Sequence, residues 1–163
     1  MIIEGKFTLK APIQKVWDSL LKPETLASCV PGVEEMELID ERTYNSVVKQ
    51  KVGPISVRFK FTTTLTEVDP PTHLKAVGKG ADIGKGGTFT QESTVDLKEL
   101  SGGEVEVSYR SDVSIVGKLA TFGDRIMRAK AKSVEEQFTK ALREKLESAT
   151  LEQSDTEMNS GGG

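Results

Sequence analysis

Cysteine and histidine are almost absent from this sequence: among its 163 residues, Cys29 is the one cysteine and His73 the one histidine. A single cysteine excludes an internal disulfide framework, and one residue of each kind cannot supply a Cys/His zinc cluster. Any Ser-His-Asp or Cys-His catalytic system would have to use His73, which has no evident orienting partner beside it in the sequence. We therefore predict no catalytic residue, no metal site and no cofactor.

Positive charge is not in excess, and long apolar runs are missing. The chain has 22 Lys and Arg against 25 Asp and Glu, a formal net charge of −3, whereas nucleic-acid-binding domains show a strong basic excess. No apolar run reaches the roughly 18–20 residues of a transmembrane helix, and no apolar signal core follows the first residue. We expect a cytoplasmic protein that binds no nucleic acid and has no transmembrane segment.

The length fits one domain of ordinary size. Hydrophobic residues make up 36% of the chain, which is close to the globular average once glycine is added. After residue 147 the sequence becomes polar and ends in three glycines, a composition typical of disorder. We predict a single domain over residues 1–147 and a disordered tail over residues 148–163.

Alternating apolar and polar residues predict a largely β protein. The first strand ends near Leu9, and Pro12 then opens a short helix with Val16, Trp17 and Leu20 on its apolar side. A second short helix is predicted over residues 24–29, with Cys29 as a small buried residue at its end. The turns between the later segments are too short for parallel crossovers, so the strands should pair antiparallel. These strands are predicted over residues 34–39, 43–52, 55–68, 73–79, 87–99 and 104–116.

Residues 118–147 contain no proline, and their apolar residues recur at intervals near 3.6. This pattern predicts one long amphipathic helix. The fold class that follows is α+β: a curved antiparallel sheet of about seven strands around a long C-terminal helix, with two short helices after the first strand. Phe122, Ile126 and Phe138 should be buried against the sheet.

The inward faces of the predicted strands mix apolar and polar side chains. A dry core would leave the polar groups unpaired at about 1–3 kcal/mol each, whereas an apolar chamber with a few polar groups is typical of a ligand pocket. The alternative is a strand register shifted by one residue, which would turn these side chains outward. The predicted cavity residues are Tyr44, Gln50, Phe59, Phe61, Thr63, Phe89, Gln91, Ser93, Val107, Tyr109, Ser111, Val113, Phe122 and Ile126.

A basic stretch begins the long predicted helix. Arg125, Arg128 and Lys132 are spaced i, i+3 and i+7 and so share one helix face. Our hypothesis is that this face meets an acidic partner or anionic lipid headgroups. The alternative is an ordinary solvated surface.

The glycine-rich segment over residues 78–87 does not match a phosphate-binding loop. Three residues rather than four separate Gly80 from Gly84-Lys85, and Gly86 stands where a magnesium-binding Ser or Thr is needed. We interpret the segment as a flexible hairpin loop.

Several short motifs resemble those of a known family. Their order is similar to that of the helix-grip fold of the START/Bet v 1-like superfamily, and two of them, CVPG and KVGP, resemble more narrowly the carbon monoxide dehydrogenase CoxG family. The resemblance covers residues 1 to about 147. The matching segments are residues 11–17, 21–26, 29–32, 51–54, 69–71 and 117–120.

This resemblance implies a non-catalytic accessory protein. Such proteins accompany molybdenum hydroxylases of the carbon monoxide dehydrogenase type and are thought to help them mature or couple to the inner membrane surface, with a lipid or quinone carried in the grip cavity. One alternative is a protein-binding adaptor with a filled interior. Another is a cavity enzyme, although the inward strand faces offer Tyr109 and no His, Asp or Glu.

Overall fold

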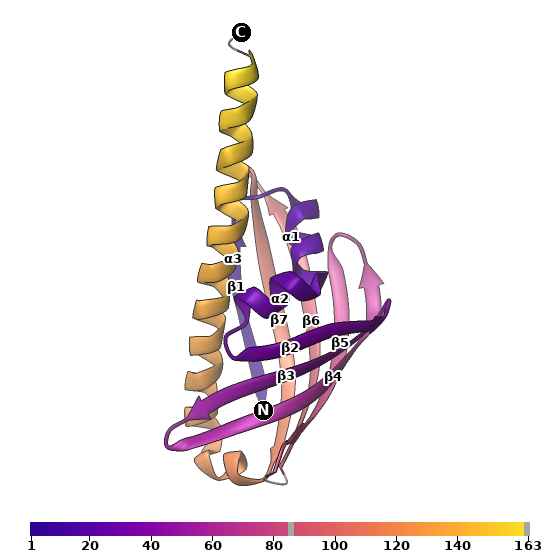
Figure 1. The fold of residues 1–163 in the computed structure, drawn as a ribbon, viewed down its shortest axis with the longest axis vertical. Helices are drawn as coiled ribbons and strands as arrows, with labels where there is room; N and C mark the ends of the chain where they lie inside the picture. Colours follow the sequence, from indigo (N-terminus) through magenta and orange to yellow (C-terminus); the bar gives the residue numbers. More distant parts are fainter. Residues whose placement is uncertain (85–86, 162–163) are drawn as a thin grey trace.

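The computed structural model describes residues 1–84 and 87–161, with side chains described as far as residue 147. The helices and strands follow one another in the predicted order (Figure 1). They are β1 (Ile2–Leu9), α1 (Ile13–Leu21), α2 (Pro23–Cys29), β2 (Val33–Asp40), β3 (Thr43–Val52), β4 (Ile55–Asp69), β5 (His73–Asp82), β6 (Thr88–Leu100), β7 (Glu104–Val116), the 3₁₀ helix η1 (Lys118–Phe122) and α3 (Gly123–Gly161).

All seven of these strands belong to one antiparallel sheet in the order β1-β7-β6-β5-β4-β3-β2. Strands β2 to β7 form a meander of hairpins, as their short connections predict, and β1 returns to pair with β7. The sheet curves strongly, and α3 runs along its open side next to β1 (Figure 1). The predicted α+β architecture is therefore confirmed.

The two short helices occupy the chain between β1 and β2. Pro12 precedes α1, and Pro23 is the first residue of α2, where a fixed φ and a missing N–H suit a helix start. Helix α1 buries Val16 and Trp17, and α2 buries Cys29 at its end, as the sequence predicts. Together α1 and α2 lie over one end of the curved sheet (Figure 1).

The long helix differs from the prediction at both ends. Lys118–Phe122 form a 3₁₀ helix, and Gly123, with φ of 75°, turns the chain into α3. At the other end α3 continues to Gly161 and projects beyond the sheet (Figure 1), whereas a disordered tail was expected from residue 148. The segment 148–161 contains no proline to end the helix, and residues 162–163 lie outside the described chain.

Two separate clusters of buried side chains form the core. The larger one lies beneath α1 and α2 and includes Leu9, Trp17 and Leu142. The smaller one gathers Val57, Phe59 and other side chains around Leu119. Because the two clusters do not merge into one, the middle of the space between α3 and the sheet is left for the cavity described below.

Helix α3 also covers the free edge of β1. The Arg143 guanidinium donates two hydrogen bonds, of 3.1 and 3.0 Å, to the Thr8 carbonyl, and Arg128 donates to the Ile2 carbonyl. The backbone N–H of Lys10 donates to a Glu147 carboxylate oxygen at 3.0 Å. These contacts occupy an edge that would otherwise expose unpaired backbone groups.

His73 starts β5 on the outer side of the sheet, where two carboxylates flank its ring. Nδ1 lies 2.6 Å from Asp96 Oδ1, and Nε2 lies 3.0 Å from Glu67 Oε2. The hydrogen bond to Asp96 first, and that to Glu67 second, raise the pKa of His73 above its ordinary value. His73 therefore has partners, although it lies apart from the cavity.

We expect the His73 imidazole to titrate above the ordinary histidine pKa of about 6.5. A raised folded-state pKa stabilises the protein below the unfolded-state pKa, and this contribution is lost as pH rises through the folded value. NMR titration of the one imidazole should show the shift, and Asp96→Asn should reduce it while Glu99→Gln on the same strand does not. A wild-type pKa at or below 6.5 would contradict the assignment.

Candidate ligand cavity

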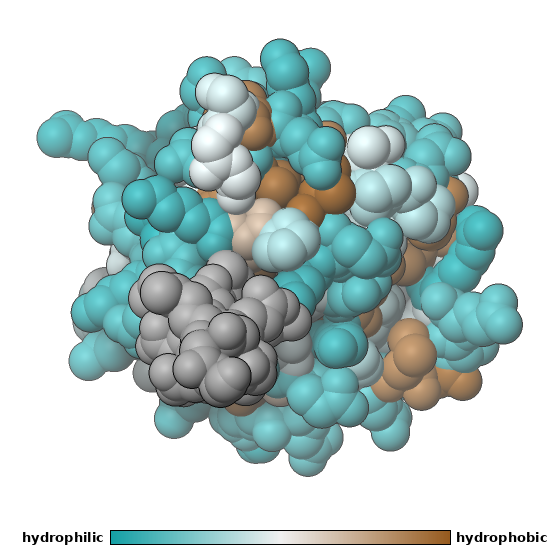
Figure 2. Space-filling view, turned by 90° about the horizontal axis from the view of Figure 1, so that it is seen from above, coloured by the Kyte–Doolittle hydropathy of each residue, from teal (hydrophilic) through white to brown (hydrophobic). Residues whose placement is uncertain are grey.

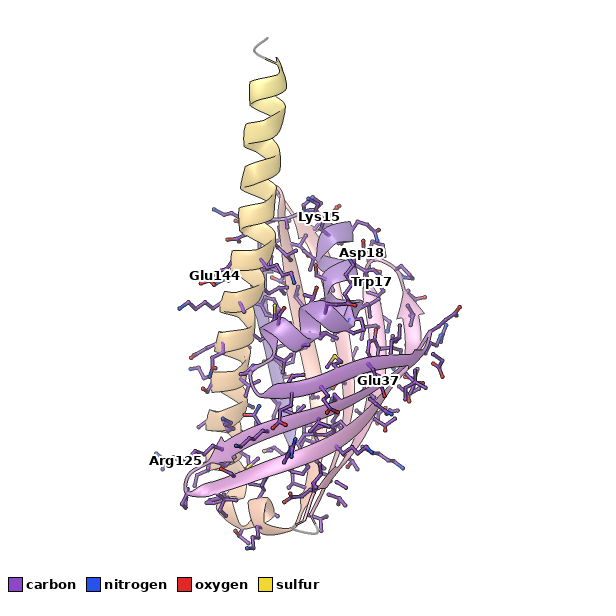
Figure 3. The ribbon with its side chains drawn as sticks, in the orientation of Figure 1. Lys15, Trp17, Asp18, Glu37, Arg125 and Glu144 are labelled. Atoms are coloured by element: carbon purple, nitrogen blue, oxygen red, sulfur yellow. The ribbon has the colours of Figure 1, made fainter. Side chains whose placement is uncertain are left out.

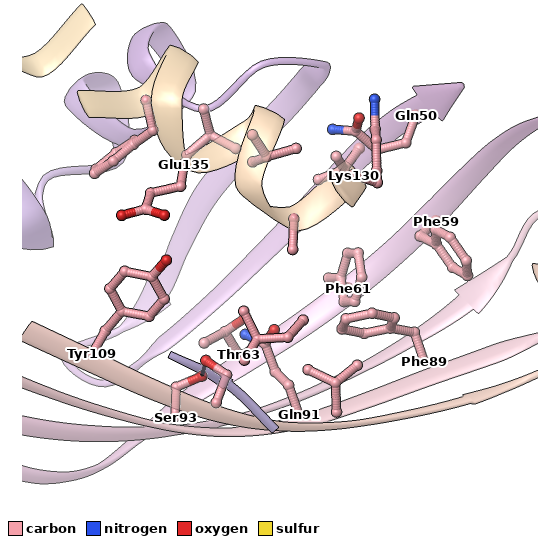
Figure 4. Close-up of a pocket in the computed structure, with 18 of the residues that line it drawn as sticks. Gln50, Phe59, Phe61, Thr63, Phe89, Gln91, Ser93, Tyr109, Lys130 and Glu135 are labelled. Carbon is pink, nitrogen blue, oxygen red and sulfur yellow. Dashed lines mark hydrogen bonds between the residues drawn. The ribbon is translucent and has the colours of Figure 1, made fainter. Parts of the chain in front are cut away.

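A cavity of about 580 Å³ lies between α3 and the concave face of the sheet (Figure 4). This volume is within the roughly 300–1,000 Å³ range of small-molecule sites. Its walls come from β1, β3, β4, β5, β6 and β7 and from one side of α3, with Leu20 and Leu26 contributed by the two short helices. The lining is predominantly apolar, so the cavity suits a hydrophobic molecule.

The alternation along the strands places most of the predicted residues on the cavity wall. A register shifted by one residue would have turned the whole set outward. The predicted residues that line the cavity are Gln50, Phe59, Phe61, Thr63, Phe89, Gln91, Ser93, Val107, Tyr109, Ser111 and Val113.

Three predicted cavity residues lie elsewhere. Tyr44 faces inward but is buried in the larger core cluster, where its hydroxyl donates a 2.6 Å hydrogen bond to the Leu21 carbonyl. Phe122 ends η1 and is half-buried against the smaller cluster. Ile126 is 44% exposed, because α3 starts at Gly123 and its cavity face begins with Met127. The prediction that Ile126 is buried is therefore wrong.

Two of the polar groups on the wall already have partners. The Ser93 and Ser111 hydroxyls are 2.7 Å apart, and the Gln50 side-chain amide donates to the Pro31 carbonyl at 2.7 Å. In the part of the chain that the structure describes, the Gln91 side chain makes no hydrogen bond, so its amide is free to meet a ligand. Gln50 instead helps to hold the segment that follows α2.

Three phenylalanines form an aromatic cluster at one end of the cavity (Figure 4). The Phe61 ring centroid lies 5.5 Å from that of Phe59 and 5.2 Å from that of Phe89. Gly80 makes room for this cluster, since a Cβ there would lie 2.5 Å from a Phe61 ring atom. The glycine-rich segment was predicted as a loop, but β5 extends to Asp82, and residues 85–86 of the remaining turn lie outside the described chain.

Helix α3 supplies two charged side chains that the strand pattern alone did not predict. Lys130 and Glu135 both line the cavity, on the helix face that also carries Val134 and Phe138. Glu135 approaches the hydroxyl of Tyr109 (Figure 4). Burial first, and the hydrogen bond and charge of Glu135 second, raise the pKa of Tyr109 well above its ordinary value, so the phenol stays protonated.

The residues of the predicted docking face are exposed on α3. Arg125 points outward near the end of the molecule opposite α1 (Figure 3). Lys132 makes no ion pair within the described residues, whereas the Arg128 guanidinium is held by the Ile2 carbonyl. Viewed from the end where α3 projects, the surface is mostly hydrophilic (Figure 2). Arg125 and Lys132 are thus the members of this face that remain available to a partner.

Two other kinds of site are missing from the described chain. Within residues 1–84 and 87–161, no three His, Cys, Asp or Glu side chains come close enough to hold a metal ion. None of the helices described is both long enough and apolar enough to cross a membrane. The cavity is therefore the feature on which a function can be argued.

A family model described as carbon monoxide dehydrogenase CoxG matches residues 5–147. This range contains both short helices, the sheet from Gly5 onward and the part of α3 that packs on it. A comparison with curated protein sequences finds no match.

Solved structures share the fold. A conserved protein from Geobacillus kaustophilus has a TM-score of 0.84 and 24% identity, with 91% of this chain and 97% of that chain covered. A START superfamily protein from Mycobacterium smegmatis has a TM-score of 0.69 and 13% identity, covering 91% and 98%. The ZhuI aromatase/cyclase from Streptomyces sp. R1128 has a TM-score of 0.65 and 14% identity, covering 90% and 93%. The fold is thus the START-type helix-grip fold.

Proposed function

Because the chain belongs to the carbon monoxide dehydrogenase CoxG family, we propose that it is a non-catalytic carrier that holds a hydrophobic small molecule, a lipid or quinone, between α3 and the sheet. The observation that carries this proposal is the apolar cavity of about 580 Å³. A protein-binding adaptor would have no use for such a hollow interior, since filling it would add stability. The adaptor alternative is accordingly the weaker one.

The enzyme served would be a carbon monoxide dehydrogenase-type molybdenum hydroxylase, which the carrier assists in maturation or in coupling to the inner membrane surface. The family membership supports this partner. A ligand that buries about 300 Å² of apolar surface gains roughly 7 kcal/mol at about 25 cal/mol per Å². Ordering and desolvation lower that gain to micromolar affinity or weaker, which suits a carrier that has to release its ligand.

Binding can be tested with an environment-sensitive apolar dye. We expect 1-anilinonaphthalene-8-sulfonate to fluoresce in the cavity and to be displaced by decanoic acid or by a short-chain quinone. If neither compound displaces the dye at millimolar concentration, the carrier proposal is wrong and the adaptor alternative takes its place.

The third possibility is a cavity enzyme. Glu135 beside Tyr109 favours it, because the sheet alone provided no carboxylate, and the ZhuI structure shows that the fold also occurs in an aromatase/cyclase. A ligand recovered unchanged after prolonged incubation with the protein supports the carrier, whereas conversion of the ligand would support the enzyme.

The basic residues of α3 support a further part of the proposal, docking on an anionic lipid surface. Arg125 and Lys132 are exposed on this helix, and the neighbouring Ile126 exposes an apolar side chain beside them. Each such cation contributes about 1 kcal/mol close to an anionic membrane. An apolar surface residue next to cations suits a lipid interface better than it suits water.

We expect the full chain to co-sediment with vesicles containing phosphatidylglycerol and much less with phosphatidylcholine vesicles. The double substitution Arg125→Glu with Lys132→Glu should weaken that binding by more than about tenfold. The double substitution Lys79→Glu with Lys98→Glu makes the same charge change on exposed sheet positions and serves as the control. Equal loss in both variants would mean that overall charge, and not this face, governs binding.

A further inference from the structure

One end of the cavity holds a polar pair that is built around a missing side chain. Tyr109 on β7 and Glu135 on α3 extend toward one another from opposite walls (Figure 4). Gly5 of β1 pairs with Tyr109 in the sheet register. A Cβ at Gly5 would lie 2.7 Å from Tyr109 Oη and 3.1 Å from Glu135 Oε1, so any side chain there would displace both oxygens.

The hydrogen-bonding capacity of this pair is one-sided. A carboxylate only accepts, and a tyrosine hydroxyl has one proton to donate. Glu135 accepts the hydrogen bond from that proton, as its effect on Tyr109 requires. The lone pairs that remain, on Glu135 and on the Tyr109 oxygen, are all acceptors.

Nothing in the described part of the chain neutralises Glu135 directly. No ion pair there includes it, and Lys130 points toward Gln50 at the other side of the cavity (Figure 4). The free amide of Gln91 lies between this pair and the aromatic cluster (Figure 4). The cavity thus has an apolar end, lined by Phe59, Phe61 and Phe89, and an acceptor end at Tyr109 and Glu135.

We propose that the Tyr109–Glu135 pair is a subsite for a hydroxyl group on an otherwise apolar ligand, so that the cavity selects alcohols, phenols or hydroquinones over matched ethers and carbonyl compounds. This inference rests on the proposed carrier function and names its ligand class. A hydroxyl donates to a charged acceptor, which makes a stronger hydrogen bond than a neutral pair. A carbonyl or ether oxygen at the same place has no proton to donate and faces the negative charge of Glu135.

The test compares 2-naphthol with 2-methoxynaphthalene, which differ in the donor and little else. By calorimetric titration of the full chain, we expect 2-naphthol to bind about tenfold or more tightly. Glu135→Leu should bring the two affinities within about twofold of one another, by weakening 2-naphthol and not the methyl ether. Tyr109→Phe should preserve the preference, because the carboxylate remains and loses its competing donor.

Two further variants keep the test independent of folding defects. Glu135→Gln retains the shape of the side chain but lets its amide donate, so the preference for 2-naphthol should fall. Gly5→Ala should reduce 2-naphthol binding by displacing both oxygens, whereas the matched control Gln91→Leu should leave the ratio of affinities unchanged. Each variant is checked for a thermal unfolding transition like that of the wild type.

The outcomes separate the subsite from the carrier function. Equal wild-type affinities for the two probes, or a ratio that survives Glu135→Leu, Glu135→Gln and Gly5→Ala, would overturn the subsite and leave the carrier proposal standing. If neither probe binds at millimolar concentration, both proposals are overturned.

Discussion

Replacement of Leu142 by alanine is expected to lower the free energy of unfolding by about 2–5 kcal/mol, the usual cost of removing a fully buried leucine side chain. Leu142 is 0% exposed and lies on α3 in the core cluster that also holds Leu9 and Trp17. It therefore joins the long helix to the part of the sheet covered by α1 and α2. Denaturant unfolding followed by circular dichroism measures the change.

Phe138→Ala provides the comparison on the same helix. Phe138 is half-buried, lines the cavity and makes an edge-on contact with Phe7 at a centroid distance of 6.3 Å. Because its ring already borders empty space, we expect its loss to cost less than that of Leu142, about 2 kcal/mol or below. A larger cost for Phe138 than for Leu142 would mean that the cavity is filled and that α3 is anchored through it.

Ser93→Phe is expected to abolish ligand binding while the protein still folds. Ser93 projects from β6 into the cavity between Tyr109 and Gln91 (Figure 4). A phenyl ring at this position occupies the space through which a ligand would reach both the aromatic cluster and the acceptor end. We expect at least about a hundredfold weaker binding of decanoic acid in the dye-displacement assay, equivalent to about 2.8 kcal/mol.

The matched control is Thr90→Phe, which places the same ring on the exposed outer face of the same strand. It should bind decanoic acid as the wild type does. The Ser93 variant loses the hydrogen bond to Ser111, so its unfolding transition must be compared with that of Ser93→Ala. A folded Ser93→Phe protein with wild-type affinity would place the binding site outside this cavity.

Strand alternation was sufficient to predict the sheet side of the cavity. Val57, Phe59, Phe61, Thr63 and Leu65 alternate strictly with outward residues, and one buried face then determines which side chains point inward. The same rule could not say where along a strand the core ends and the cavity begins. Tyr44 has the inward parity, but its position on β3 places it beneath α1, in the core.

The helix side was harder to predict. A continuous helix from residue 118 gave Phe122 and Ile126 the inward phase, whereas the 3₁₀ turn and the positive φ of Gly123 reset that phase. The face that actually lines the cavity starts at Met127 and includes Ala131 and Phe138. Glu135 falls on this face, four residues after Ala131, so a correct helix start would have revealed it.

The shape of the cavity depends on tertiary contacts that no local pattern contains. Two core clusters form at separate places, and the return of β1 to β7 brings Gly5 opposite Tyr109. A glycine inside a strand is a sequence signal for close approach of another group. The identity of that group, a tyrosine more than a hundred residues away, required the strand pairing.

Native mass spectrometry of the protein purified from its own host tests the carrier function most directly. We expect a species heavier than the 163-residue chain by the mass of one small apolar molecule, which organic solvent releases, and which is lost in Ser93→Phe but kept in Thr90→Phe. Accurate mass and fragmentation of the released compound then show whether it carries a hydroxyl group. A chain that flies only at its bare mass, and that takes up no added decanoic acid or short-chain quinone under the same conditions, would contradict the carrier function.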